Sequence, residues 1–181
     1  FSPKHIIFPQ TPIIEFLQSQ PQPFRVFAEE VIPINLLMPY NLSRIEGYDA
    51  VYSIRFAKYL SVLNSSNVNA DPMGRYGIVN NIDSNLLNIA NAKYILAVKK
   101  DGKILKKFEK PYFQPVFEDK TVVVLKNLKT SPRAEMFYDW EISKDDTETL
   151  TRLIDPNFLI TKKIILEKDP ELTKNSGEST I

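Results

Sequence analysis

The stretch "AKYILAVKKDGKILKKFEKPYFQPVFEDKTVVVLKN", residues 92–127, decides the fold. It holds short runs rich in β-branched and aromatic residues, and turn residues separate these runs at 101–102 and at 118–120. Short runs of this kind, joined by Asp-Gly and similar tight connections, are typical of antiparallel strands. The stretch therefore predicts an antiparallel arrangement of strands at 92–100, 101–108, 111–118 and 120–127.

Helical patterns lie on both sides of this stretch. Four segments combine a capping residue with apolar side chains at helical spacing, and they begin at Thr11-Pro12, at Ser53, at Asp83-Ser84 and at Ser143. Further strands are expected in "FRVFAEE" (24–30), "RAEMFYDWEI" (133–142) and "LITKKIILE" (159–167). We therefore expect an α+β fold, with a mixed, mostly antiparallel sheet and three or four helices.

Side-chain alternation predicts which strand residues are buried. Phe24, Val26 and Ala28 alternate with more exposed positions, which is typical of a half-buried strand. Phe137 and Trp140 face opposite sides of a strand with a two-residue period, so one of them is expected to be a main packing residue.

Length and composition bound the class of protein. The chain has 181 residues, of which 43% are hydrophobic and 25% charged, as expected for one globular domain. We place this domain at 1–170 and a polar linker or disordered tail at 171–181. The net charge of +1 argues against nucleic acid as a partner. Because the chain begins at Phe1 rather than Met, we expect it to be a segment of a longer protein.

The motif "SRIEGYDAVYS", residues 43–53, lies in a long connection without a sustained period. Such connections often carry function on a rigid scaffold. With Arg55 it supplies the candidate surface or loop-organising residues, which are Arg44, Glu46, Gly47, Tyr48, Asp49, Tyr52 and Arg55. Gly47 is expected to need a backbone conformation that a side chain disfavours.

The two acids of this motif admit a catalytic and a structural interpretation. Glu46 and Asp49 can meet the separation of about 5 to 9 Å that glycoside hydrolysis requires. Arg44 and Arg55 lie close enough in sequence to neutralise both acids and lower their pKa values. We favour the structural interpretation, in which Asp49 holds the loop by accepting hydrogen bonds from backbone N–H groups or from these arginines.

Other catalytic chemistry has little support in the sequence. The chain has no cysteine, and its single histidine, His5, lies near the N-terminus, so thiolate, Ser-His-Asp and multi-histidine metal sites are not expected. We expect no metal and no cofactor. Trp140, Tyr112 and Tyr138 could stack on a sugar, but aromatic residues at strand positions are more often part of the core.

Several stretches together carry a resemblance to a known family. They are "TPIIEFLQSQPQPFRVF", "NLLMPYNLSRIEGYDAVYSIRFAKYL", "LLNIANAKYILAV", "VVVLKNLKTSPRAEMF" and "LIDPNFLITKKIILE". In this order they resemble the extracytoplasmic region of the bacterial YfhO-type membrane protein family. The most specific elements are the turn Gly47-Tyr48-Asp49, the Leu-Leu-Asn-x-x-x-x-Lys-Tyr stretch that begins at Leu86, and Ser131-Pro132-Arg133-Ala134.

The resemblance implies a function outside the cytoplasmic membrane. The family is similar to the C-type glycosyltransferases, multi-spanning proteins thought to use a polyprenyl-phosphate-linked sugar. It implies that this chain is the first part of a soluble region, with its own transmembrane region as a partner and with cell-wall glycan or lipid-linked sugar as possible ligands. We therefore expect an extracytoplasmic accessory or acceptor-recognition module of a membrane glycosyltransferase, which is not catalytic alone.

Two alternatives remain open at this point. The first is a non-catalytic cell-envelope scaffold or binding domain of a membrane protein. The second is a free-standing carbohydrate hydrolase that uses Glu46 and Asp49.

Overall fold

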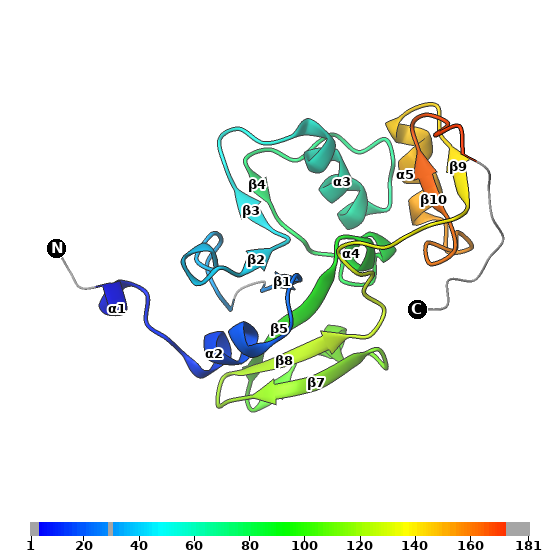
Figure 1. The fold of residues 1–181 in the computed structure, drawn as a ribbon. Coiled ribbons are helices and arrows are strands. Elements are labelled where there is room, and N and C mark those ends of the chain that lie inside the picture. The colour runs from blue at the N-terminus through cyan, green and yellow to red at the C-terminus, as the bar shows by residue number, and fades with distance from the viewer. Residues whose placement is uncertain (1–3, 29–30, 173–181) are drawn as a thin grey trace.

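A six-stranded mixed sheet forms the centre of the computed structural model, which describes residues 4–28 and 31–172 (Figure 1). Along the main path the strands are β2 (Ser43–Arg44), β1 (Arg25–Phe27), β5 (Ala92–Lys100), β8 (Val122–Asn127) and β7 (Phe113–Glu118), while β6 (Lys103–Ile104) pairs with β5. Strand β1 runs parallel to β2 and β5, and the pairs β5–β8, β7–β8 and β5–β6 are antiparallel. The predicted α+β class with a mixed, mostly antiparallel sheet is confirmed.

The helices surround this sheet. In the described part of the chain they are the single turn α1 (Lys4–Ile7), then α2 (Pro12–Ser19), α3 (Ile54–Ser65), α4 (Asn85–Ile89) and α5 (Asp146–Ile154), with 3-10 turns η1 (Met38–Tyr40) and η2 (Lys106–Phe108). Beyond the single turn α1, the described residues form four helices, which agrees with the three or four predicted. None of the helices described is long and apolar enough to cross a membrane.

Three of the four predicted helix starts are correct. Thr11 Oγ1 accepts a hydrogen bond from Ile14 N at 3.4 Å, and Ser84 Oγ accepts one from Leu86 N at 3.3 Å. Ser53 occupies the N-cap position of α3 without a side-chain capping bond.

The predicted Ser143 cap of the last helix is wrong. Asp145 Oδ1 accepts from Glu148 N at 2.8 Å and caps α5. Ser143 is buried, and its hydroxyl bonds with that of Thr149 at 2.6 Å. A carboxylate two residues later competes better for the positive N-terminal end of the helix.

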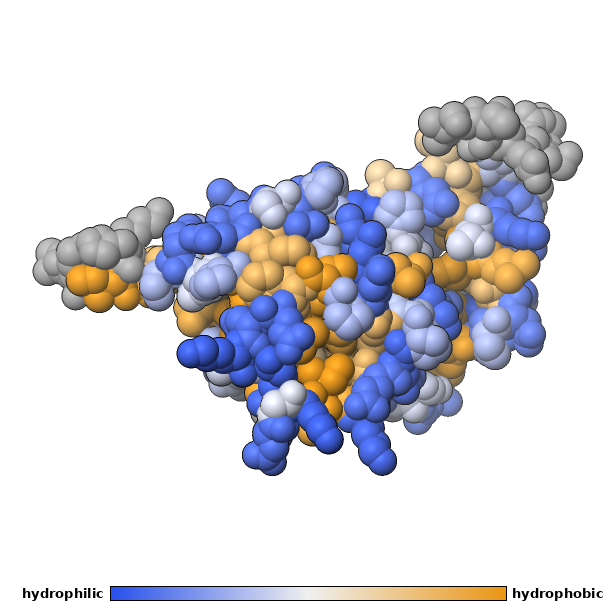
Figure 2. Space-filling model, turned by 90° about the horizontal axis from the view of Figure 1, so that it is seen from below, coloured by the Kyte–Doolittle hydropathy of each residue, from blue (hydrophilic) through white to orange (hydrophobic). Residues whose placement is uncertain are grey.

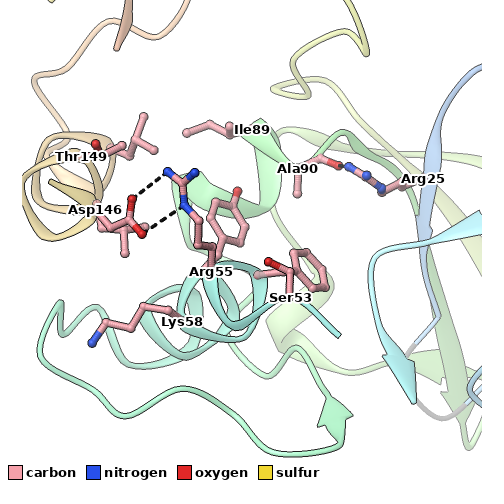
Figure 3. Close-up of a pocket in the computed structure, with 12 residues that line it drawn as sticks. Arg25, Ser53, Arg55, Lys58, Ile89, Ala90, Asp146 and Thr149 are labelled. Atoms are coloured by element: carbon pink, nitrogen blue, oxygen red, sulfur yellow. Dashed lines mark hydrogen bonds and ion pairs between the residues drawn. The ribbon is translucent and has the colours of Figure 1, made fainter. Parts of the chain in front are cut away.

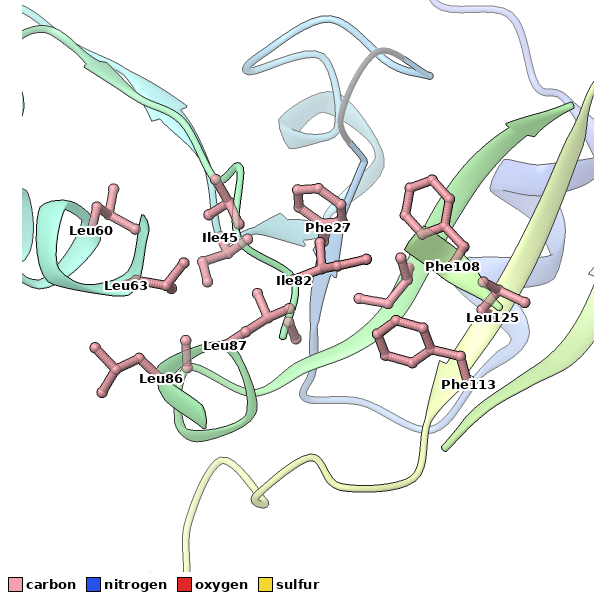
Figure 4. Packing of buried hydrophobic residues seen from close by; sticks show 14 of the residues in the cluster. Phe27, Ile45, Leu60, Leu63, Ile82, Leu86, Leu87, Phe108, Phe113 and Leu125 are labelled. Atoms are coloured by element: carbon pink, nitrogen blue, oxygen red, sulfur yellow. The ribbon is translucent and has the colours of Figure 1, made fainter. Parts of the chain in front are cut away.

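The two faces of the sheet bury separate hydrophobic clusters. On β5 and β8 the side chains of Ile95 and Leu125 pack with those of α3 and α4, whereas Leu96 and Val124 pack with those of α2. Figure 1 shows α2 and the pair α3 and α4 on different sides of these strands. In Figure 4 the side chain of Leu63, from α3, points into the first cluster. The alternating side chains of the central strands are therefore covered on both faces.

This covering corrects the half-buried prediction for residues 24–30. Phe27 faces the first cluster with 0% exposure, and Val26 faces the second. Strand β1 lies inside the sheet, between β2 and β5, and its side chains belong to the hydrophobic clusters on both faces. Residues 29 and 30, at the end of the predicted strand, lie outside the described residues.

The outer strand leaves some apolar surface visible. Figure 2 views the molecule from below, on the side where β7 lies in Figure 1, and apolar side chains gather in the middle of this face among hydrophilic ones. Phe117 of β7 is half-buried and stacks on Phe16 of α2 with ring centroids 5.1 Å apart. The α2 helix therefore covers this edge only in part.

Two small sheets lie outside the central one. Strand β3 (Gly47–Tyr48) pairs antiparallel with β4 (Tyr76–Gly77), and β9 (Trp140–Ile142) pairs parallel with β10 (Ile164–Leu166). The strands predicted at 133–142 and 159–167 are therefore much longer than the observed ones. Residues 133–136 are exposed and have no strand partner, whereas α5 forms the crossover that a parallel pair requires.

The aromatic prediction for this region is confirmed in part. Trp140 is buried, as predicted for one of the two, and Phe137 is half-buried, but neither belongs to the two hydrophobic clusters and Phe137 lies before β9. Residues 1–3 and 173–181, where the exposed N-terminus and most of the polar tail are expected, lie outside the described residues.

Candidate functional site

A buried ion pair stands at the base of the quoted motif. Arg44 Nε and Nη2 lie 2.8 and 2.6 Å from Glu46 Oε2, with side-chain exposures of 5% and 2%. Arg44 Nη1 also donates to Ile32 O. Glu46 accepts from the backbone amides of Ala28 and Val79, each at 3.4 Å. The pair therefore ties β1, β2 and the segment after β4 together.

Burial decides the protonation behaviour of Glu46. Loss of water around the carboxyl raises its pKa above the ordinary value, and the charge and hydrogen bonds of Arg44 oppose this rise only in part. The predicted net lowering of this pKa is therefore wrong, although Arg44 acts in the lowering direction as expected. Desolvation outweighs one salt bridge when the carboxyl is almost fully enclosed.

The second acid of the motif lies in a different environment. Asp49 is exposed, and its Oδ1 accepts a hydrogen bond from Val51 N at 3.1 Å. The predicted backbone contact is therefore present. The predicted arginine contacts are not made in the described structure, because Arg44 pairs with Glu46 and Arg55 pairs with Asp146 and Glu167.

Gly47, Tyr48, Asp49 and Tyr52 line one hollow, which we call the aromatic pocket. Its volume is about 280 Å³, and its other lining residues are Asn35, Met38, Phe56 and Gly77. Tyr48 lines this hollow, and its ring lies beside that of Tyr76, with ring centroids 4.6 Å apart and an interplanar angle of 34°. These rings stay 42% and 56% exposed. Two large apolar surfaces are thus held together in contact with solvent.

Hydrogen bonds hold the walls of the aromatic pocket in place. Asn35 Nδ2 donates to Tyr48 O at 2.8 Å, and Tyr48 N donates to Asn35 Oδ1 at 3.3 Å. Asn35 has a positive φ of 70°, which Asn tolerates better than most residues. The hydroxyl of Tyr52 donates to Met73 O at 3.1 Å and also contacts Gly74 O. The pocket is therefore preformed rather than assembled from loose side chains.

One of the two glycines in the β3–β4 pair allows these strands to pack on α3. Gly47 lies opposite Gly77 in the β3–β4 pair, and Tyr48 lies opposite Tyr76. A Cβ on Gly77 would come 2.8 Å from Leu60 Cδ1, whereas a Cβ on Gly47 would meet nothing within 4 Å. The expectation for Gly47 is therefore wrong, since neither its φ nor its surroundings exclude a side chain. Gly77 carries the steric requirement.

Several residues of this site are missing from the sequence prediction. Asn35, Met38, Phe56, Tyr76 and Gly77 come from segments before and after the motif. The sequence holds one signal for them, because Tyr76-Gly77 repeats Gly47-Tyr48 in reverse order, as two antiparallel strands with matching residues would. Two-residue strands are too short for periodicity to reveal this pairing.

The other proposed sugar-stacking residues lie elsewhere. Trp140 is buried and Tyr112 is half-buried, and the Tyr112 hydroxyl donates to Asp83 Oδ1 at 2.9 Å. Tyr138 is exposed but contributes nothing to the aromatic pocket. His5 lies in α1. Among the residues that the structure describes, no group of three or more His, Cys, Asp or Glu could hold a metal ion.

A larger hollow of about 530 Å³ lies between α3, α4 and α5 (Figure 3). Arg55 closes one side through Asp146, with Nη2 2.7 Å from Oδ1, and Arg25 Nη1 donates to Ala90 O at 2.8 Å. The Tyr59 hydroxyl donates to Leu86 O, and burial raises its pKa. Arg55, Arg25 and Tyr59 of this hollow thus form hydrogen bonds with other groups of the protein, and we do not assign chemistry to the hollow.

Comparisons with known proteins identify no relative. No protein-family model, curated protein or solved structure matches the chain. The relation to the YfhO-type family therefore rests on the sequence stretches alone and continues here as a proposal.

Proposed function

We propose that this chain is a glycan-recognition module that binds sugar in the aromatic pocket. In this proposal it is the acceptor-recognition part of a membrane glycosyltransferase and acts on the extracytoplasmic side of the bacterial membrane. The observation that carries the binding role is the exposed ring pair of Tyr48 and Tyr76, in which Tyr48 lines a preformed hollow.

The chemistry of the aromatic pocket suits a sugar. Aromatic rings offer flat apolar faces on which the C–H face of a pyranose can lie. Asp49 supplies a carboxylate and Asn35 an amide beside these rings, and such groups bond sugar hydroxyls. A few polar groups within an otherwise apolar and preformed pocket are typical of small-ligand sites.

Binding fits the residues better than hydrolysis. A glycosidase needs two carboxyl groups at the scissile bond. Glu46 is enclosed, accepts hydrogen bonds from Ala28 N, Val79 N and Arg44 Nε, and forms an ion pair with Arg44. Among the described lining residues of the aromatic pocket, Asp49 is the only acid. The hydrolase alternative therefore lacks an accessible second acid.

The membrane assignment is supported by the resemblance to the YfhO-type family. It makes the parent protein's own transmembrane region the natural partner and makes cell-wall glycan or lipid-linked sugar the natural ligands. A glycosyltransferase acts on such molecules, and a soluble module would hold the acceptor near the catalytic region.

A second candidate function is protein binding by a scaffold domain. The exposed apolar residues around the aromatic pocket favour it, since Val51 is 85% exposed and Ile54 and Met38 are also well exposed. Gathered apolar side chains at a surface often mark a protein contact. In a membrane protein this surface would face the parent's transmembrane region.

Calorimetric titration with neutral oligosaccharides tests the glycan proposal. We expect Tyr48→Ala to weaken the binding of a bound oligosaccharide at least tenfold, about 1.4 kcal/mol, because one stacking face is lost. Tyr138→Ala is the matched control, since it removes an exposed tyrosine outside the pocket and should leave the affinity unchanged. Equal weakening by both variants, or no binding to any glycan tested, would overturn the proposal.

A double variant separates the two candidate functions. Val51→Ser with Ile54→Ser removes exposed apolar side chains that do not line the aromatic pocket. A glycan-recognition module keeps its oligosaccharide affinity in this variant. A scaffold instead loses binding to the parent's transmembrane region, measured by co-purification of the two parts, while Tyr48→Ala has a smaller effect.

A further inference from the structure

Another hollow, lined mainly by polar residues, lies beside the aromatic pocket, and we call it the arginine pocket. Its volume is about 340 Å³, and its lining includes Arg25, Arg44, Arg133, Glu46 and Ser43. Asn35 and Met38 line both this hollow and the aromatic pocket. The two pockets therefore share a wall.

The arginine pocket carries excess positive charge. Its lining has three arginines and one acid in the described structure, and Glu46 is already engaged with Arg44 and two backbone amides. No carboxylate of a described residue forms an ion pair with Arg25 or Arg133. Among the described residues, therefore, neither of these two guanidinium groups that line the hollow has a carboxylate partner.

A hydrogen bond to the backbone holds the Arg25 side chain in place. Its Nη1 donates to Ala90 O at 2.8 Å, which uses one of the five N–H donors of the guanidinium and fixes its position. Burial and the nearby charge of Arg133 lower the pKa of Arg25, because both make its charged form less favourable. An anion between the two groups would relieve the repulsion.

We propose that the arginine pocket binds an oxyanion, a carboxylate or a phosphate, carried by the same glycan that occupies the aromatic pocket. The ligand is then an acidic glycan, with its anionic group between Arg25 and Arg133 and a sugar ring on Tyr48. A guanidinium group binds a carboxylate and a phosphate in the same way, through its positive charge and two parallel N–H donors. The glycan part of this inference rests on the proposed function.

The anion site is tested first without any sugar. Inorganic phosphate and acetate are titrated separately, with the arginine Nε–Hε signals followed by NMR. We expect saturable shifts of Arg25 and Arg133 with at least one of the two anions, and the better anion identifies phosphate or carboxylate as the group bound. Shifts confined to other arginines, or the absence of saturation with both anions, would overturn the anion site.

A matched pair of charge variants locates the site. Arg133→Gln removes an exposed charge that lines the arginine pocket and should weaken anion binding about tenfold or more. Arg75→Gln removes an exposed charge that lines neither this hollow nor the aromatic pocket and should leave binding unchanged. Equal effects of the two variants would show general charge attraction and contradict the proposal.

Neutral and acidic oligosaccharides then test the ligand class. We expect an oligosaccharide that bears the better anion to bind at least tenfold more tightly than its neutral counterpart, and we expect Arg133→Gln to abolish this difference. Neutral and acidic forms of equal affinity would overturn the inference while the proposed glycan recognition stands. Anion binding without binding of any glycan would overturn the proposed function and the acidic-glycan inference together, but not the anion site.

Discussion

Arg44 and Glu46 form an ion pair inside the domain, with Arg44 Nη2 2.6 Å from Glu46 Oε2. The pair stands directly before Gly47 and Tyr48, which line the aromatic pocket. Because Glu46 also accepts from backbone amides on two other segments, the pair fixes the base of the strand that carries Tyr48. Glu46, which the sequence offers as one acid of a catalytic pair, therefore has a structural role.

Removal of one partner of this pair should destabilise the domain strongly. We expect Arg44→Leu and Glu46→Leu each to lower the free energy of unfolding by about 3 to 5 kcal/mol, because each leaves a buried charge without its partner. The double variant should cost less than the sum of the two. Urea unfolding of the three variants measures this, and strictly additive costs would contradict a coupled pair.

The stability of the domain should also depend on pH through Glu46. Burial raises the pKa of Glu46 in the folded state above its ordinary value of 4.5, so the folded state binds the proton more tightly than the unfolded state. This contribution to stability is fully present below the unfolded pKa and is lost as pH rises through the folded pKa. The stability of the wild type relative to Glu46→Gln should therefore fall as pH rises from below 4.5 through the raised pKa. Thermal unfolding across this window checks it, and a relative stability that increases with pH would count against it.

A steric test compares three glycines. Gly77→Ala places a Cβ 2.8 Å from Leu60 Cδ1 and should lower the free energy of unfolding by about 1 to 3 kcal/mol, because the buried leucine has to move. Gly47→Ala and Gly74→Ala are the controls, since a Cβ at either position meets nothing within 4 Å. These two should be neutral or stabilise by about 0.4 to 1 kcal/mol. Chemical denaturation of all three variants measures these differences. A Gly77→Ala variant as stable as the two controls would contradict the packing of β4 against Leu60.

Asp49 should act on binding and hardly on stability. Its carboxylate is exposed and accepts one hydrogen bond from Val51 N in its own loop, so Asp49→Ala should change the free energy of unfolding by less than about 1 kcal/mol. The same variant should weaken oligosaccharide binding, because the pocket loses its acceptor for sugar hydroxyls. Paired melting and titration experiments decide this, and a folded variant with full affinity would remove Asp49 from the site.

The sequence predicts β5, β7 and β8 of the central sheet well because these strands are long enough to show a pattern, whereas the strand predicted at 101–108 is only β6, followed by the 3-10 turn η2. Residues 92–127 contain both the strand residues and the turns between them, so local rules identify β5, β7 and β8. The short strands β2, β3 and β4 have two residues each, and their existence depends on partners distant in the sequence. Local patterns carry no information about such pairing.

The sequence predicts only part of the candidate site, because some of its residues come from segments that pair over a long sequence distance. The motif at 43–53 supplies Tyr48, Asp49 and Tyr52, which do line one pocket. Tyr76 contacts the ring of Tyr48 only through the pairing of β3 with β4, and the burial of Glu46 depends on how β1 and β2 meet. These relations arise from packing between segments that are distant in the sequence.

The location of bound glycan tests the central claim most directly. Backbone amide shifts of the intact chain, mapped during titration with an oligosaccharide that binds, should change most at Gly47, Tyr48, Tyr52 and Tyr76, around the aromatic pocket. Saturable changes there, with little change on β7 and β8, are the result that our account predicts. Saturable changes confined to β7, β8 or α5, with the residues of the aromatic pocket unaffected, would contradict it.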